Sequence, residues 1–189
     1  MRFILLGGPG AGKGTQAGKL KEHFGIVHLS TGEVLREARA AGTELGRKAV
    51  EYMDTGKLLP DDIILGIVSE KLDMPEMEKG FLFDGFPRTI PQAEGLEELL
   101  GKKNLELDAV VSIEIQDEIV IERLLKRAEI EGRSDDNRET IENRLRVYYD
   151  QTEPLKVYYE KSGLLKSVDG VGTVDEVFER IIKQLVSGC

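Results

Sequence analysis

The sequence predicts an α/β protein whose core is a doubly wound, five-stranded parallel sheet, and three observations support this prediction. Short apolar runs of strand length alternate with segments of helical periodicity along the whole chain. The first run, residues 2–6, is continuously apolar after Arg2, which is typical of a strand buried on both faces of a parallel sheet. Glycines follow this run directly, and ligands of such sheets bind in the loops that follow the strands.

Each element follows from the same patterns. The strands are predicted at residues 2–6, 26–29, 80–83, 109–113 and 164–168. The helices are predicted at about 13–23, 32–41, 44–54, 62–72, 90–101, 117–130, 137–160 with a break near Pro154, and 174–187. A single crossover needs fewer than the three helices found between the second and third strands. We therefore expect residues 30–59 to form a helical excursion from a core made of residues 1–29, 60–126 and 133–189.

Composition limits the classes of function. The chain has 189 residues, enough for one domain, and a net charge of −9, which disfavours nucleic acid and anionic membranes as partners. Its single cysteine, Cys189, excludes an internal disulfide and a cysteine cluster on a metal. No apolar stretch approaches the roughly 18 residues that span a bilayer. We therefore expect a soluble protein of the reducing cytoplasm.

The loop after the first strand carries the strongest motif. Residues 7–15 read G-G-P-G-A-G-K-G-T and contain G-x-x-x-x-G-K, in which backbone N–H groups and a lysine surround phosphates. The loop follows a buried strand and precedes a helix, whose N-terminus also attracts anions. A glycine-rich turn with a solvated Lys13 is the alternative. Gly14 stands where the motif usually has Ser or Thr, and Thr15 follows, which weakens the case for a direct hydroxyl ligand to Mg²⁺.

Two further features point to phosphate chemistry. Asp84 ends the third strand and can orient magnesium directly or through water, although turn formation is an alternative. Half of the twelve arginines fall within 24 residues, at Arg123, Arg127, Arg133, Arg138, Arg144 and Arg146. An apolar stripe of Ile121, Leu124, Leu125 and Ala128 predicts that Arg123 and Arg127 lie on the opposite helix face. A solvated face is the alternative for these two, and we expect Arg138 and Arg146 to form surface salt bridges.

Three motifs together resemble the adenylate kinases, a family of nucleoside monophosphate kinases. They are residues 7–16, residues 29–32 followed by Arg36, and F-D-G-F-P-R-T at residues 83–89, in the family's order and spacing along essentially the whole chain. The resemblance implies a P-loop nucleoside monophosphate kinase fold and reversible transfer of the terminal phosphoryl group of Mg-ATP to AMP, which gives two ADP. It also implies a monomer.

The resemblance assigns roles residue by residue. The ATP side is assigned to Gly10, Ala11, Gly12, Lys13, Gly14, Thr15, Arg123, Arg127 and Gly172. The AMP side is assigned to Thr31, Arg36, Lys57, Leu58, Leu59, Gly85, Phe86, Pro87, Arg88, Gln92, Arg133 and Arg144. The catalytic cations are Lys13, Arg88, Arg123, Arg133 and Arg144, and Asp84 holds Mg²⁺ through water. Because the acceptor is itself an anionic phosphate, such a site needs positive charge and alignment rather than a general base.

The segment between Arg127 and Arg133 has only five residues, A-E-I-E-G, which resembles the short-lid form of the family without structural zinc. We expect this lid, residues 127–132, and the excursion to close over both nucleotides, with Asp135 and Asp136 holding arginines or ribose. A UMP/CMP kinase is the nearest alternative, against which Thr31 and Gln92 argue. A GTPase-like switch is disfavoured because the sequence has no Asn-Lys-x-Asp motif.

Overall fold

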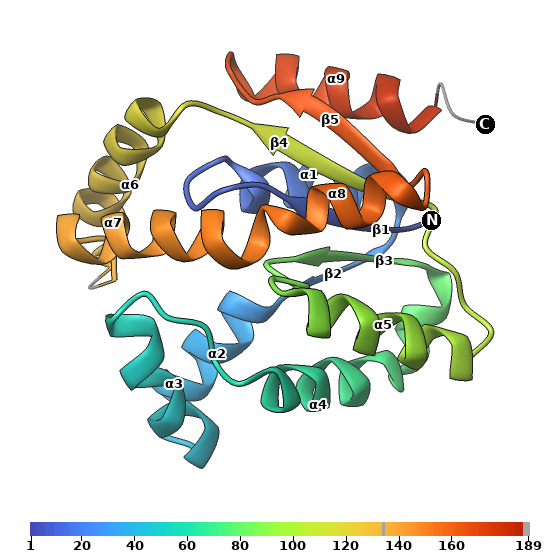
Figure 1. Ribbon diagram of the computed structural model, residues 1–189, viewed down its shortest axis with the longest axis horizontal. Coiled ribbons are helices and arrows are strands. Elements are labelled where there is room, and N and C mark those ends of the chain that lie inside the picture. Colours follow the sequence, from blue (N-terminus) through green and yellow to red (C-terminus); the bar gives the residue numbers. More distant parts are fainter. Residues whose placement is uncertain (134, 187–189) are drawn as a thin grey trace.

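The computed structural model describes residues 1–133 and 135–186. Its sheet consists of β1 (Arg2–Leu6), β2 (Val27–Ser30), β3 (Phe81–Asp84), β4 (Ala109–Glu114) and β5 (Leu165–Asp169), in the order β2-β3-β1-β4-β5 (Figure 1). All four pairings are parallel. The predicted fold class is therefore confirmed, and no predicted strand end differs from the observed one by more than one residue.

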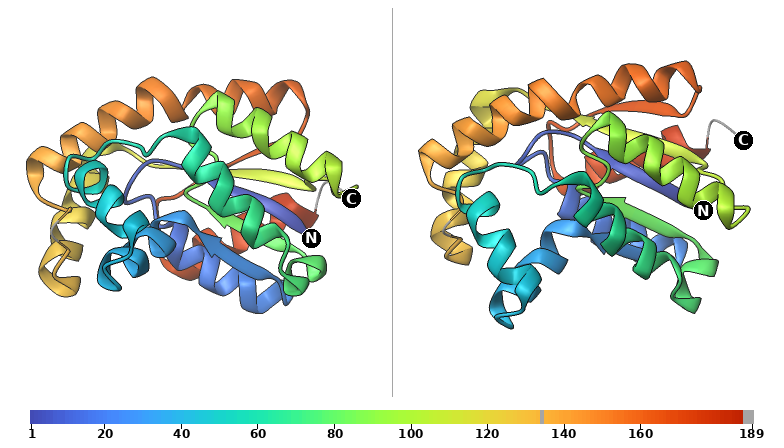
Figure 2. Two further views of the ribbon diagram at one scale, coloured as in Figure 1. Left: turned by 90° about the horizontal axis from the view of Figure 1, so that it is seen from below. Right: turned by 60° about the horizontal axis from the view of Figure 1, so that its bottom comes forward.

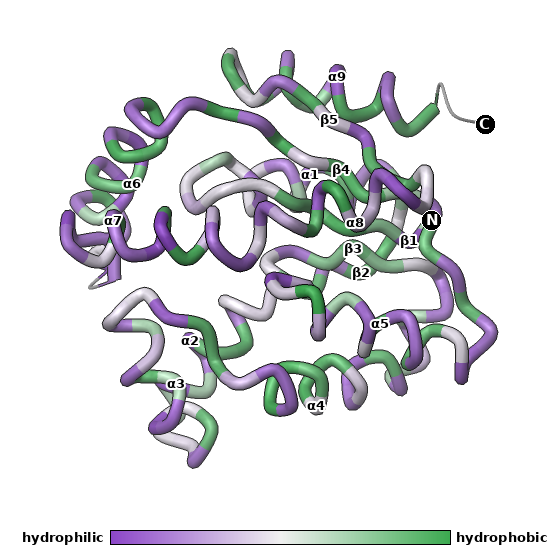
Figure 3. Tube along the Cα trace, in the orientation of Figure 1, coloured by the Kyte–Doolittle hydropathy of each residue, from purple (hydrophilic) through white to green (hydrophobic). Residues whose placement is uncertain are grey.

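Both faces of the sheet are covered by helices, so the central strands are apolar on both sides (Figure 3). Phe3 of β1 packs in one core cluster with residues of α1 (Lys13–Phe24) and α9 (Val174–Val186). Its neighbour Ile4 packs in a second cluster with residues of α4 (Asp61–Leu72), α5 (Ile90–Lys102) and α8 (Pro154–Lys161). This alternation explains why β1 is apolar at every position from Phe3 to Leu6.

Residues 30–59, the segment predicted as an excursion, contain α2 (Thr31–Ala40) and α3 (Glu44–Asp54), which project from the carboxyl end of the sheet (Figures 1 and 2). The two helices pack closely, because a Cβ atom on Gly46 would lie 2.1 Å from the carbonyl oxygen of Ala38. The end of α3 touches α7 (Arg138–Val147), where the Thr140 hydroxyl donates to the carbonyl of Asp54 at 3.1 Å. The excursion therefore closes one side of the space above the sheet.

The long helical segment after α6 (Asp117–Glu131) departs from the prediction. Its regular α-helix ends at Val147, a π-helical turn covers Tyr148–Thr152, and Pro154 is the first residue of α8. The expected break near Pro154 is thus displaced upstream, because proline is well tolerated at the first position of a helix. A 3₁₀ turn at Pro75–Lys79 was also not predicted. The last predicted helix ends at Val186, and Cys189 lies outside the described residues.

Candidate active site

The loop between β1 and α1 has a backbone that requires glycine. Gly7, Gly10 and Gly12 have φ values of 141°, 77° and 91°. A Cβ atom on Gly7 would lie 2.8 Å from the carbonyl oxygen of Ile113, and one on Gly10 would lie 2.9 Å from Cγ of Leu124. Larger residues would therefore be strained or would clash at these positions. The result is a compact turn at the N-terminus of α1, whose free N–H groups are suited to an anion.

Lys13 lies inside this loop, where its ammonium donates to the carbonyls of Gly7 at 2.7 Å and Gly8 at 2.8 Å. Burial lowers its pKa to about 8; Asp84 opposes this change, and Arg88 adds to it. Burial alone would raise the pKa of Asp84, but His28 and Lys13 lower it below its ordinary value. The opposite charges of Lys13 and Asp84 therefore attract each other at the end of β3, and both groups are charged at neutral pH.

A cavity of about 660 Å³ opens above the loop. All nine residues that the sequence assigns to ATP line it, namely Gly10, Ala11, Gly12, Lys13, Gly14, Thr15, Arg123, Arg127 and Gly172. Gly172 has a φ of 128° and precedes Thr173, whose N–H donates to Oε2 of Glu176 at 2.7 Å. The Glu176 N–H donates in return to the Thr173 hydroxyl at 3.3 Å, which makes a capping box at the start of α9.

A second cavity of about 80 Å³ lies between the excursion and the sheet. Nine of the residues assigned to AMP line it, namely Thr31, Arg36, Lys57, Leu58, Leu59, Gly85, Arg88, Gln92 and Arg144. Three others lie elsewhere. Arg133 lines the larger cavity, Pro87 lines a small adjoining one, and Phe86 is a core residue whose ring lies 5.6 Å from that of Phe83.

The two cavities share one wall, formed by Gly32, Arg36, Gly85, Arg88 and Arg144. Arg88 is fixed at three points: its Nε donates to the carbonyl of Gly85, its N–H to Oε1 of Gln92, and its carbonyl accepts from the Thr152 hydroxyl, each at 2.8 Å. Burial lowers the pKa of Arg88 to about 10, and Arg144 contributes to this change. Its guanidinium therefore remains charged at neutral pH.

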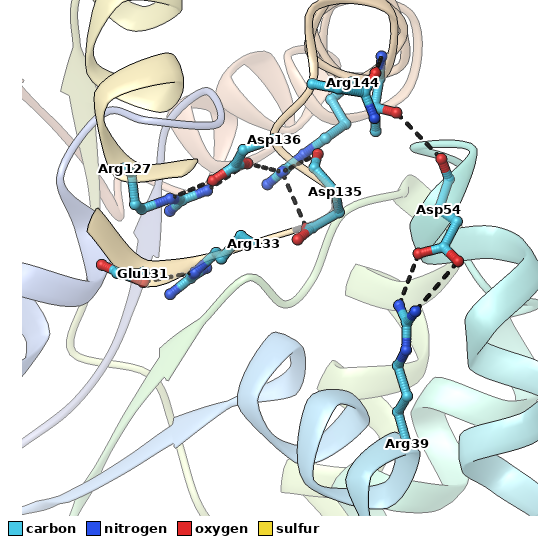
Figure 4. Close-up of polar contacts among 10 residues, drawn as sticks. Arg39, Asp54, Arg127, Glu131, Arg133, Asp135, Asp136 and Arg144 are labelled. Atoms are coloured by element: carbon cyan, nitrogen blue, oxygen red, sulfur yellow. Dashed lines mark hydrogen bonds and ion pairs between the residues drawn. The ribbon is translucent and has the colours of Figure 1, made fainter. Parts of the chain in front are cut away.

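Three other arginines of the site pair with acidic side chains near the segment that joins α6 to α7 (Figure 4). Arg133 pairs with Glu131, the last residue of α6, at 2.6 Å. Arg127 makes a bidentate pair with Asp136, at 2.6 and 2.8 Å. Arg144 contacts Asp136 at 2.8 Å and Asp135 at 3.3 Å. Burial alone would lower the pKa of Arg127, but its hydrogen bonds to the Asp136 carboxylate raise this pKa overall. Because Asp136 is only 1% exposed, this carboxylate depends on its two arginine partners.

Comparison with known proteins agrees with this geometry. The family model described as adenylate kinase matches residues 5–164. The chain belongs to the adenylate kinase family. It is 52% identical to the adenylate kinase of Xanthomonas euvesicatoria over 98% of this chain and 99% of that protein. It is 49% identical to that of Stenotrophomonas maltophilia, over 96% and 97%, and 47% identical to that of Carboxydothermus hydrogenoformans, over 96% and 97%. The predicted resemblance is therefore confirmed.

The arginines of α6 differ from the sequence prediction in one respect. Val120 and Leu124 are each 1% exposed, whereas Leu125, assigned to the apolar stripe, is 36% exposed. The buried stripe is therefore rotated, and Arg123 and Arg127 flank it rather than oppose it. In this member of the adenylate kinase family the inner face of α6 covers the glycine loop, so the face that packs is also the face that lines the cavity.

Two polar residues near the site were not assigned a role from the sequence. Nε2 of His28 lies 3.6 Å from Oδ2 of Asp84, an ion-pair distance rather than a hydrogen bond. Thr152 anchors the Arg88 carbonyl from the π-helical turn. Neither role is visible without the pairing of β2 with β3 or the docking of the long helical segment. Of the outlying arginines, Arg138 pairs with Glu142 at 3.1 Å as expected, whereas Arg146 donates to Asn143 and not to a carboxylate.

The polar groups suit a magnesium–nucleotide complex better than a metal bound by protein alone. Among the residues that the structure describes, no group of three His, Cys, Asp or Glu side chains is arranged around a metal position. Asp84 is only 9% exposed, lines the cavity above the glycine loop, and lies 3.7 Å from the position of a Cβ atom on Gly14. One carboxylate beside a phosphate loop is the set that Mg²⁺ uses when the nucleotide and water supply its other ligands.

Proposed function

We propose that this protein catalyses the reversible transfer of the terminal phosphoryl group of Mg-ATP to AMP, giving two ADP. The observation that carries the proposal is the shared wall of the two cavities, in which Arg36, Arg88 and Arg144 lie between them. The larger cavity, with the glycine loop, takes ATP, and the smaller one takes AMP. Two polyanions that repel each other in water then meet at fixed positive charges.

The chemistry follows from this arrangement. An AMP phosphate oxygen, already ionised, attacks the γ-phosphorus of ATP, so no side chain has to remove a proton. The new phosphorus–oxygen bond forms as the bond to the β-phosphate oxygen breaks, and ADP leaves with that electron pair. Lys13 and the loop N–H groups bind the donor phosphates, while Arg36 and Arg88 bind the acceptor phosphate. Arg123, Arg133 and Arg144 stabilise charge on the transferring group.

The base and ribose of each nucleotide occupy the ends of the cavities. On the AMP side, Thr31, Gln92 and the strip Lys57, Leu58 and Leu59 contact the nucleoside. Gly85, Phe86 and Pro87 shape the turn that leads to Arg88, and Phe86 acts there from the core. On the ATP side, the backbone at Gly172 contacts the base. The unequal cavity volumes support this assignment, because the larger guest needs the larger space.

Mg²⁺ would be held by Asp84 together with nucleotide phosphates and water. The ion would supply charge neutralisation between the phosphates of ATP. Within the chain, His28 and Lys13 keep the Asp84 carboxylate ionised. We propose no structural zinc, in keeping with the short segment between Arg127 and Arg133.

Closure is the second part of the proposal. The excursion of residues 30–59 and the lid of residues 127–132 close on the core, which consists of residues 1–29, 60–126 and 133–189, and exclude water that would otherwise accept the phosphoryl group. The contact between α3 and α7 supports this, because it already links the excursion to the helix that carries Arg144. Probes on α3 and α5 should approach each other when a bisubstrate dinucleotide binds. An unchanged distance would contradict closure.

Initial rates decide the substrate. With ATP as donor, AMP should be phosphorylated faster than UMP, CMP or GMP, with two ADP formed for each AMP consumed. Faster turnover of UMP would replace the assignment by a UMP/CMP kinase. ATP hydrolysis that is slow and unaffected by AMP would instead indicate a nucleotide-dependent switch.

The remaining proposals concern the oligomeric state, the location and the partners of the protein. We propose that the protein acts as a monomer in the cytoplasm without nucleic acid or membrane partners, and its net charge of −9 supports this. No helix in the described part of the chain is long and apolar enough to cross a bilayer. Sedimentation at micromolar concentration should give a mass near 21.0 kDa. A mass twice that value would contradict the monomer.

A further inference from the structure

Gln92 is held by two partners on different elements. It is 2% exposed and lines the smaller cavity from the first turn of α5. Its Oε1 accepts from the N–H of Arg88 at 2.8 Å, and its Nε2 donates to Oδ1 of Asp61, at the start of α4, at 2.7 Å. The same Asp61 oxygen accepts from the hydroxyl of Thr89 at 3.0 Å. Asp61 itself does not line the cavity.

These partners determine which way the amide of Gln92 faces. A backbone N–H only donates, so the side of the amide next to Arg88 must be oxygen. An ionised carboxylate only accepts, so the side next to Asp61 must be nitrogen. A flipped amide would place its oxygen against the Asp61 oxygen and its NH₂ group against the Arg88 N–H. Each contact would then be repulsive in a buried place, where an unmet polar group is costly.

One N–H and one lone pair of Gln92 remain after these two hydrogen bonds. A base that carries a ring nitrogen acceptor next to an exocyclic NH₂ group, such as a 6-aminopurine, matches this pair. A 6-oxopurine presents the reverse pattern, a ring N–H next to a carbonyl. It would need the flipped amide. The fixed orientation thus favours 6-aminopurines over 6-oxopurines. Without these partners the Gln92 amide could rotate to bind either class.

We propose that Asp61 is a positioning residue that selects 6-amino over 6-oxo purine monophosphates by fixing the amide of Gln92. This proposal rests on the proposed function, since it assumes that the smaller cavity takes the base of the acceptor. Asp61 acts from outside that cavity. Its effect therefore appears in the choice between acceptors and not in the use of ATP.

The test compares AMP with inosine monophosphate, which has an oxo group in place of the 6-amino group. In Asp61→Asn the side chain at position 61 can accept or donate, so one of the two fixed partners of Gln92 is lost. The ratio of kcat/KM for AMP to that for inosine monophosphate should fall roughly tenfold or more, the usual weight of a hydrogen bond to a charged group. The KM for ATP should stay within about twofold of wild type.

Asp62→Asn is the matched control. Asp62 is the exposed neighbour in the first turn of α4, so this variant removes the same formal charge from the same helix end. Its acceptor ratio should equal that of wild type. A second control uses Gln92→Ala: adding Asp61→Asn to it should leave the ratio unchanged, because Asp61 acts only through the amide. If Asp61→Asn unfolds, Asp61→Ser, which is too short to reach Gln92, carries the same prediction.

The outcomes separate this proposal from the function on which it rests. An unchanged ratio in a folded Asp61 variant, or an equal change in Asp62→Asn, would overturn the role of Asp61 and leave AMP phosphorylation standing. A further fall in the double variant beyond Gln92→Ala would also overturn it. A wild-type protein that does not phosphorylate AMP would instead refute the proposed function.

Discussion

The cations of the candidate site fall into two groups, which differ in whether a carboxylate is paired with them. Arg127 and Arg144 are paired with carboxylates at the start of α7. Lys13 and Arg88 form no ion pair with any described carboxylate, and burial lowers the pKa of both. Burial also lowers the pKa of Arg144, although Asp135 and Asp136 oppose this change. The first group is therefore paired within the protein, whereas the second group is free to bind an anion.

This difference separates stability from function. A buried unpaired cation destabilises the folded protein, and a bound phosphate removes that destabilisation, so binding energy is concentrated where the ligand-free protein is least stable. A paired cation stabilises the ligand-free protein and has to exchange a carboxylate for a phosphate when nucleotide binds. Arg127, in the lid, and Arg144, in the core, are therefore suited to contacts that change when the lid closes, whereas Lys13 and Arg88 are suited to fixed points of binding.

Lys13→Met should cause the largest loss. We expect kcat to fall about 10³-fold, the scale for removing one preorganised donor from a charged transition state. The same change should raise the melting temperature of the nucleotide-free protein at pH 7, because it removes an unpaired buried charge. Lys21→Met, on the exposed side of the same helix, should leave kcat within about twofold. Normal kcat with Lys13→Met would refute the role of the glycine loop.

Arg88→Met and Arg144→Met should have similar effects on kcat but opposite effects on stability. Both should lower kcat by about 10²-fold or more. Unfolding by urea without nucleotide should show opposite effects on stability. Arg88→Met removes an unpaired charge and should raise the free energy of unfolding. The carbonyl of Gly85 loses its hydrogen bond from Arg88 but keeps the one from the Thr31 hydroxyl, so it is not left without a partner. Arg144→Met deprives Asp135 of its ion-pair partner and should lower stability by about 1–3 kcal/mol. Equal stability changes would remove the distinction between the groups.

The pH dependence tests the unpaired group in the intact protein. The lysine of an unfolded chain has a pKa near 10.5, and burial brings that of Lys13 to about 8. Above pH 8, kcat/KM should therefore fall by up to tenfold per pH unit as the free enzyme loses this proton. Between pH 8 and 10.5 the unfolded chain binds more protons than the folded one, so Lys13 makes its stability rise with pH. In Lys13→Met this rise should be absent. If kcat/KM stays constant up to pH 10, the pKa of Lys13 is not lowered by burial, and the prediction is wrong.

The sequence predicted those features that depend on local chemistry. The strands followed from apolar runs, and the glycine loop followed from its motif. It also predicted most of the residues that line the two cavities, because motifs on neighbouring parallel strands meet at one edge of the sheet.

Features that depend on how distant elements dock were missed. The inner face of α6 was placed incorrectly because Leu125 has the right spacing for a buried stripe but faces solvent at 36% exposure. The π-helical turn was missed because proline marked a later position as the break. The contact between Asp61 and Gln92 joins residues 31 positions apart on different helices, and no periodicity indicates it. Such partners are set by packing between elements.

The smallest effect on activity is expected for Arg138, which belongs to the arginine cluster of the sequence but not to the candidate site. Arg138 is exposed, with a side chain 74% accessible, and pairs with Glu142 one helical turn away. Arg138→Gln should leave kcat and both KM values within about twofold and change stability by about 0.5 kcal/mol at most. Arg133→Gln, in the same cluster but lining the larger cavity, should lower kcat by about tenfold or more. If both variants behave alike, the cluster acts through its summed charge and not through individual positions. Raising the salt concentration would then reduce the activity of the wild type by a similar factor.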